Sequence, residues 1–243
     1  MATHLTRGEL KRDELGEAVG ASVHWAERHW KTILASIGAL AVVVLVGWGV
    51  FAWRGSRLDA ANRLLADALK IGDAQVVPSG AKPNDPDQPT FATAAARDAQ
   101  ARPLFEAVIT KYGGTGAGAA AHLWLAKQAY VAGDTAAARK HWEAFLAVDR
   151  EGALAAEAQR DLWVLDRNEG KGETALGQIR AALENGEGPL PADVLLWELA
   201  ETERKLGHDQ DAHATYQRIV EEHANSPYAP LARRELVATG NGS

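Results

Sequence analysis

Residues 119–152 read AAAHLWLAKQAYVAGDTAAARKHWEAFLAVDREG, and residues 193–226 read DVLLWELAETERKLGHDQDAHATYQRIVEEHANS. The two stretches have equal length and carry the same kinds of residue at the same offsets: leucine then alanine, a glycine, an alanine, and an aromatic residue four positions later. Apolar residues at this spacing predict helices, and the glycine marks the end of the first one. Each stretch therefore predicts a helical hairpin, and the repetition predicts that such hairpins stack.

The chain around these two stretches has the same helical character, interrupted by short breaks. We predict helices over residues 57–71, 92–112, 118–132, 135–148, 154–168, 173–184, 193–206, 210–222 and 227–238. A bend or restart is expected at Pro103. A third, less regular hairpin is predicted over residues 154–188, with its turn at Gly170. Segments 57–71 and 92–112 predict a fourth hairpin.

Residues 72–90 separate the two helices of that fourth hairpin. They contain Pro78, Pro83, Pro86 and Pro89, a density that predicts a loop without regular structure. The loop could be a linker between two domains. We expect an exposed loop within one domain, because the helix before it cannot bury its own apolar face.

The pattern resembles the tetratricopeptide repeat, which pairs leucine with a small residue and follows them with Gly-Asp, alanine and an aromatic residue. Leu125-Ala126, Gly133-Asp134 and Trp142 carry the resemblance in the first copy, and Leu199-Ala200 and Tyr216 in the second. The resemblance covers about residues 57–236 and implies an all-α solenoid that ends in a capping helix. A non-repetitive helical bundle is the alternative fold.

An uncharged stretch, TILASIGALAVVVLVGWGVFAW, occupies residues 32–53. As a helix it would be roughly 30 Å long, about the thickness of the membrane hydrocarbon. Trp25 and Trp30 precede it and Trp48 and Trp53 close it, as expected of anchors at the two interfaces. We predict a membrane-spanning helix rather than a cleaved signal peptide, because about thirty residues precede it and no small-residue cleavage site follows.

The predicted span divides the chain into a tail (residues 1–31), the span (32–53) and the repeat domain (54–243). Leu10, Leu15, Val19 and Val23 suggest either an amphipathic helix at the membrane surface or a solvated tail. Lysine and arginine are nearly balanced on the two sides of the span, so charge does not choose the orientation.

One span followed by such repeats resembles a bacterial inner-membrane family that contains an ancillary subunit of the SecYEG translocon. The rhythm of residues 105–134 carries this likeness. The resemblance implies a cytoplasmic N-terminus, periplasmic repeats, and an adaptor or chaperone for proteins, in association with the translocon or another envelope complex. The alternative is a structural scaffold that self-associates.

Signals of catalysis or cofactor binding are absent from the sequence. The chain has no cysteine and a net charge of −6, which argues against thiolate chemistry and nucleic-acid binding. The run GGTGAG at 113–118 lacks the strand or the GK[ST] ending that a phosphate loop needs. Histidine pairs 24/29 and 208/213 lie five apart, which does not align ligands on one helix face. We predict a non-enzymatic protein without cofactor, metal or small-molecule substrate.

The remaining functional surface is the groove that stacked hairpins form along their first helices. The resemblance implies that it is lined by Leu123, Lys127, Tyr130, Val131, Trp197, Glu201, Arg204 and Lys205. An aromatic anchor with a charged rim suits extended peptides. The alternative interpretation is that Trp197 is buried between repeats and the charges are only solvated.

Overall fold

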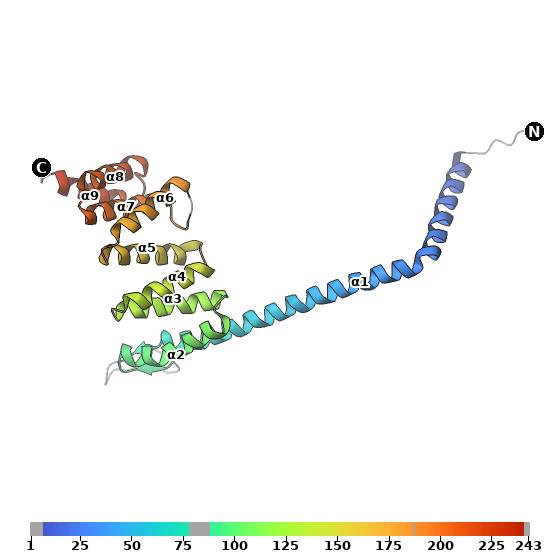
Figure 1. The fold of residues 1–243 in the computed structure, drawn as a ribbon, viewed down its shortest axis with the longest axis horizontal. Helices are drawn as coiled ribbons and strands as arrows, with labels where there is room; N and C mark the ends of the chain where they lie inside the picture. The colour runs from blue at the N-terminus through green and yellow to red at the C-terminus, as the bar shows by residue number, and fades with distance from the viewer. Residues whose placement is uncertain (1–6, 78–87, 187, 241–243) are drawn as a thin grey trace, which may run out of the picture. The chain divides into compact units, whose positions relative to one another are not determined.

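The computed structural model describes residues 7–77, 88–186 and 188–240, and within them it is helical apart from one pair of two-residue strands (Figure 1). The elements are α1 (Arg7–Gly72), β1 (Gln75–Val76), β2 (Thr90–Phe91), α2 (Ala94–Tyr112), α3 (Gly116–Val131), α4 (Thr135–Val148), α5 (Gly152–Asn168), α6 (Gly172–Asn185), α7 (Ala192–Leu206), α8 (Asp209–Glu222) and α9 (Ala229–Gly240). The chain divides into two units, Met1–Arg57 and Leu58–Ser243, and α1 contributes residues to both.

The first unit contains the apolar part of α1. Within the described residues, α1 is the one helix long and apolar enough to cross a membrane, judged by length and composition. Its large apolar side chains, such as Leu45 and Phe51, are exposed. Trp30, Trp48 and Trp53 are exposed as well, whereas the side chain of Trp25 lies outside the described ones.

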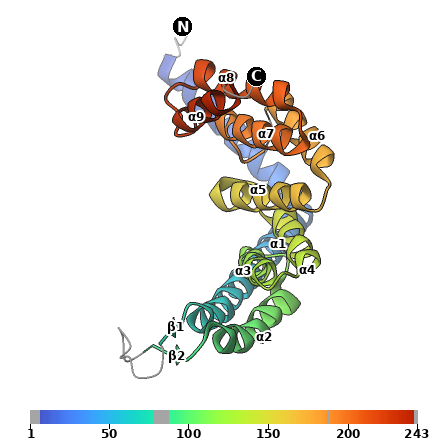
Figure 2. The same ribbon diagram turned by 90° about the vertical axis from the view of Figure 1, so that its left-hand side faces the viewer.

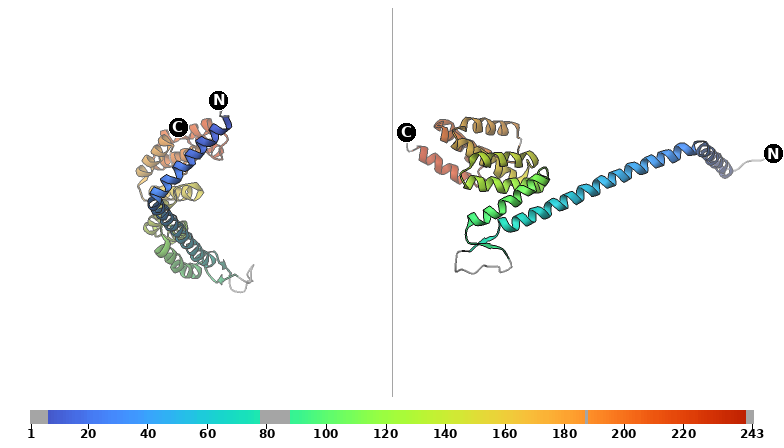
Figure 3. Two further views of the ribbon diagram at one scale, coloured as in Figure 1. Left: turned by 90° about the vertical axis from the view of Figure 1, so that its right-hand side faces the viewer. Right: turned by 60° about the horizontal axis from the view of Figure 1, so that its bottom comes forward.

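The second unit is a succession of antiparallel helices, each packed against the next from α2 to α9 (Figures 1 and 2). The helix ends lie within two residues of those predicted between residues 92 and 240. The predicted all-α repeat fold is confirmed. Two further views show the same order of helices (Figure 3).

The hairpins recur every 37 residues. Gly133, Gly170 and Gly207 end the first helices of successive hairpins with φ of 80°, 76° and 79°, a left-handed conformation that glycine adopts without strain. The 34-residue motif is therefore followed by a three-residue spacer. The two best-matching stretches start 74 residues apart, which is twice 37, and the less regular copy lies between them.

Three local expectations need correction. Residues 72–90 are not wholly irregular, because β1 pairs in parallel with β2 through Gln75↔Thr90 and Val76↔Phe91. Helix α2 continues through Pro103. Helix α3 begins at Gly116, so half of the GGTGAG run is helical rather than loop. The expectations for Pro78, Pro83 and Pro86 lie outside the described residues.

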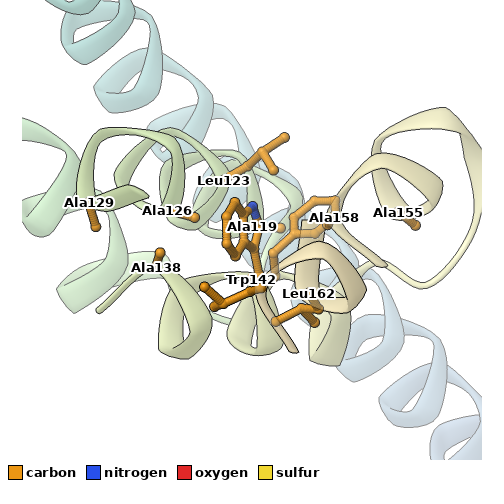
Figure 4. Packing of buried hydrophobic residues seen from close by; sticks show 11 residues of the cluster. Ala119, Leu123, Ala126, Ala129, Ala138, Trp142, Ala155, Ala158 and Leu162 are labelled. Atoms are coloured by element: carbon orange, nitrogen blue, oxygen red, sulfur yellow. The ribbon is translucent and has the colours of Figure 1, made fainter. Parts of the chain in front are cut away.

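The core of the described residues is a chain of four clusters, and each joins one hairpin to the next helix. Ala61 and Ala68 at the end of α1 pack with Phe105 of α2 and Leu125 of α3, so residues 58–72 serve as the first helix of the first hairpin. The next cluster surrounds Trp142 with residues of α3, α4 and α5 (Figure 4). The remaining two clusters join α5 to α7 and α7 to α9.

Candidate protein-binding surface

The first helices α3, α5 and α7 are connected along one side by ion pairs. Lys127 Nζ of α3 lies 2.9 Å from Glu157 Oε1 of α5. Arg160 Nε of α5 lies 2.7 Å from Glu198 Oε1 of α7. These pairs place charged side chains of three consecutive hairpins on a continuous surface, which we call the first-helix face.

A second arginine fixes the junction between α5 and α7. Arg167 Nη1 donates to Glu198 Oε2 at 2.9 Å and to Thr202 Oγ1 at 3.0 Å. The Glu198 side chain is almost fully buried, and a buried carboxylate needs such partners to offset its lost hydration. The relative position of the two helices is therefore set by specific contacts as well as by packing.

In the first copy, the structure places three of the four predicted groove residues at the surface. Lys127 is exposed, Tyr130 is 41% exposed and Val131 is 83% exposed. The Tyr130 ring lies 5.5 Å from the Trp142 ring in a tilted arrangement, which holds it in place. Leu123 is only 8% exposed and belongs to the core around Trp142, so it contributes little to this surface.

In the second copy, Trp197, Glu201 and Arg204 contact neighbouring side chains. Trp197 is half-buried and stacks on Tyr228 at a centroid distance of 5.3 Å. Glu201 accepts hydrogen bonds from the Tyr216 hydroxyl at 2.6 Å and from Arg204 at 2.8 Å. Burial pushes the pKa of Glu201 upward, but these two hydrogen bonds outweigh it, so its pKa lies below the usual value. Lys205 is exposed.

A close histidine pair was not predicted from the sequence. His122 of α3 and His141 of α4 place their Nδ1 atoms 2.9 Å apart, so one ring donates to the other. Burial lowers the pKa of both rings; His141 and Lys140 lower the pKa of His122 further, and Lys140 and Arg102 lower that of His141. The pair was missed because its members lie on different helices. Both histidines lie in one predicted hairpin, one on each helix, and this is the signal that could have revealed the pair.

We expect this pair to make stability depend on pH. The unfolded histidines take up protons near pH 6.5, while the folded ones stay neutral to lower pH, so the unfolded state binds more protons there. The stabilising contribution is complete above pH 6.5 and is lost as the pH falls through and below it. Denaturant midpoints at pH 7.5 and 5.5 should differ less in H122Q/H141Q than in the wild type.

The variant H213Q is the matched control for that measurement, because His213 lies on α8 in another hairpin and is partly exposed. It should keep the wild-type difference between the two midpoints. A double variant with an undiminished difference would contradict the assignment to His122 and His141.

The described residues include no group of three or more histidine, aspartate or glutamate side chains placed to hold a metal ion. The buried carboxylate of Glu198 faces Arg160 and Arg167 of α5, and that of Glu203 on α7 faces Arg180 of α6 at 3.0 Å. The contacts on the first-helix face hold neighbouring helices together, and its exposed side chains can contact another protein.

The family model of the tetratricopeptide repeat matches residues 195–226. This match covers the α7–α8 hairpin and the following turn. No curated protein and no solved structure matches the chain. The chain thus contains a tetratricopeptide repeat, a module whose stacked hairpins present surfaces to other proteins, and this points to a role in protein–protein interaction.

Proposed function

We propose that this protein is a membrane-anchored, non-enzymatic adaptor that binds extended segments of partner proteins on its first-helix face. The observation that carries the proposal is the pairing of Lys127 with Glu157 and of Arg160 with Glu198, which joins three hairpins into one surface. A surface longer than one hairpin suits an extended chain better than a compact ligand.

The side chains of this face supply both an anchor and a rim. Tyr130 offers a half-exposed aromatic ring held against Trp142, and aromatic residues dominate binding energy at protein interfaces. Lys127 and Glu157 beside it are each about half exposed. They can exchange their mutual contact for charges or amides of a ligand.

The membrane anchor is the second half of the proposal. Trp30 and Trp53 lie about 35 Å apart along an α-helix, slightly more than the hydrocarbon thickness of about 30 Å. Each ring has a cation near it, with Lys31 Nζ 5.9 Å from the Trp30 centroid and the Arg57 guanidinium 5.4 Å from that of Trp53. We place residues 32–53 in the bacterial inner membrane.

We further propose that the N-terminus is cytoplasmic and the repeat domain periplasmic, next to the Sec translocon or another envelope complex. The family resemblance supports this assignment. Tethering would raise the local concentration of a weak binding surface near membrane machinery without requiring tight affinity.

The absence of cysteine gives a direct test of orientation. A2C and A136C each introduce a single thiol, the first in the tail and the second on the exposed side of α4. A membrane-impermeant maleimide should label A136C in cells with a permeabilised outer membrane, and A2C only after the inner membrane is lysed. The reverse pattern would overturn the periplasmic assignment.

Co-purification from mild detergent after crosslinking tests the binding role. The double variant K127E/Y130S should lose most of the partner protein recovered with the wild type, because it reverses the rim charge and removes the anchor. The control R234E changes a charge on exposed α9 and should keep the partner. Equal recovery with all three proteins would refute the first-helix face as the binding surface.

A self-associating scaffold is the second candidate function. It is favoured by Leu231 and Val237 on α9, which are 39% and 65% exposed. Under this alternative the full chain would form oligomers in detergent that V237E disrupts. A monomer at all concentrations would eliminate it.

A further inference from the structure

A cavity of about 580 Å³ lies between α4, α5, α6 and the connection that leads into α7. The first-helix face is built from α3, α5 and α7, so the second-helix sides of α4 and α6 belong to a different surface. Ligand pockets typically have volumes of about 300–1,000 Å³. This cavity therefore has the size of a binding site.

The cavity exists because one hairpin departs from the repeat. In the 37-residue register, Trp163 of α5 takes the position of Ala126 in α3 and Ala200 in α7. The small residue lets α3 lie closely along α4 and α7 along α8, whereas α5 and α6 meet over a shorter stretch. The indole is fixed by its Nε1–H, which donates to Gln178 Oε1 at 2.9 Å.

The connection between α6 and α7 forms another wall. Residues 186–191 join these helices, compared with residues 149–151 between α4 and α5. Gly186 and Gly188 have φ of 64° and 111°, a left-handed region that glycine adopts without strain. Leu190 is consequently buried against the core of α5, α6 and α7.

The floor of the cavity is apolar, formed mainly by Leu146, Leu162, Trp163, Leu190 and Leu195. A large aliphatic or aromatic side chain is the group such a floor would stabilise. A second hollow adjoins the cavity and is lined by Arg150, Gly188, Pro189 and Asn185. The combined surface is longer than a single side chain, which favours an extended peptide over a compact small molecule.

The rim of the cavity carries the charged side chains of Arg139, Glu143 and Arg150. Arg139 is paired within the protein, whereas Glu143 and Arg150 are not paired with any of the described residues. Arg139 contacts Asp166 at 2.6 Å and Glu169 at 2.9 Å, and hydrogen bonds from Lys171 and Arg139 lower the pKa of Glu169 to about 2. Glu143 and Arg150 are exposed and make no ion pair with another described residue. Arg150 Nε donates only to the Leu146 carbonyl, at 3.3 Å.

We propose that this cavity is a second peptide site, specific for an extended segment that presents a basic, a large apolar and an acidic residue at alternate positions. Glu143 would bind the basic residue and Arg150 the acidic one. Both side chains line the cavity, Glu143 from α4 and Arg150 from two residues beyond the end of that helix. In an extended chain, a basic and an acidic residue separated in this way lie about 13 Å apart.

Fluorescence anisotropy of the full chain in detergent micelles tests the proposal, with the labelled peptide Gly-Ser-Lys-Ser-Leu-Ser-Glu-Ser-Gly as the probe. We expect saturable binding, and roughly 30-fold weaker binding when the leucine of the peptide is replaced by serine. A182L, which adds a side chain to the cavity wall, should abolish binding. G177L adds the same side chain to open space on α6 and should not.

The charge assignment has its own test. R150E should weaken binding of the probe about fivefold and strengthen binding of a peptide with lysine in place of glutamate by a similar factor. R233E, a charge reversal on α9, should change the binding of neither peptide. These results separate the cavity from the first-helix face, because K127E/Y130S should leave probe binding unchanged.

Three outcomes would overturn the proposal. The first is the absence of saturable binding up to about 1 mM, the weak end of specific recognition. The second is unchanged binding by A182L. The third is loss of binding by K127E/Y130S together with retention by A182L, which would place the peptide on the first-helix face.

Discussion

Replacing Gly118 by alanine is expected to destabilise the repeat domain by about 3 kcal/mol, the upper range for forcing an atom into a packed site. A Cβ atom at this position would overlap the Tyr112 carbonyl oxygen and lie 2.6 Å from Gly113 Cα. Both obstacles are backbone atoms of the turn between α2 and α3, so no side chain can rotate away. Denaturant unfolding followed by far-UV circular dichroism measures the loss.

Gly116→Ala is the matched control, two residues earlier in the same helix. No atom lies within 4 Å of a Cβ added there, and alanine is a better helix former than glycine by about 1 kcal/mol. This variant should be as stable as the wild type or slightly more stable. If Gly118→Ala behaved like Gly116→Ala, the close approach of the α2–α3 turn would be disproved.

These two glycines show what the sequence could predict and what it could not. The run GGTGAG identified a connection between helices, because glycine disfavours a helix interior. It could not show that Gly116 and Gly118 lie inside α3, or that only Gly118 faces a backbone. That distinction depends on how closely α2 and α3 approach, which is a property of the packed hairpin.

The register of the repeats could likewise be predicted only in part from the sequence. Leu125-Ala126 and Leu199-Ala200 revealed the two regular hairpins because their small residue is present. The hairpin between them has Trp163 at that position, so its register became clear only from the recurring glycines and the helix ends. The cavity was likewise invisible in the sequence, since it results from this substitution together with the longer connection before α7.

The groove residues were predicted from the resemblance to the tetratricopeptide repeat, which does not fix how deep each side chain lies. Lys127 and Val131 are exposed as expected for an outward face. Leu123 is covered because the neighbouring hairpin packs over it, and Trp197 is partly covered by Tyr228. Both differences arise from contacts between repeats, beyond the reach of a pattern within one helix.

Trp142→Ala is expected to cost about 4 kcal/mol, as large-to-small changes at buried aromatic residues do. Trp142 is 1% exposed, and its cluster joins α3, α4 and α5. Its indole Nε1–H is buried without a hydrogen-bond partner among the described residues. Trp142→Phe removes that unpaired donor while keeping most of the ring, so its cost should be about 1 kcal/mol or less. Urea midpoints of the two variants test the difference.

The location of Trp142 adds a second expectation about cooperativity. In a solenoid each repeat contacts only its neighbours, so stability is transmitted through the junctions between hairpins. Removing the indole weakens the junction between α4 and α5, and Trp142→Ala should therefore unfold in two transitions where the wild type shows one. Trp197→Ala is the control, because Trp197 is half-buried at the C-terminal end and its loss leaves that junction intact. A single shifted transition in Trp142→Ala would show that the junction is held by its ion pairs rather than by this core.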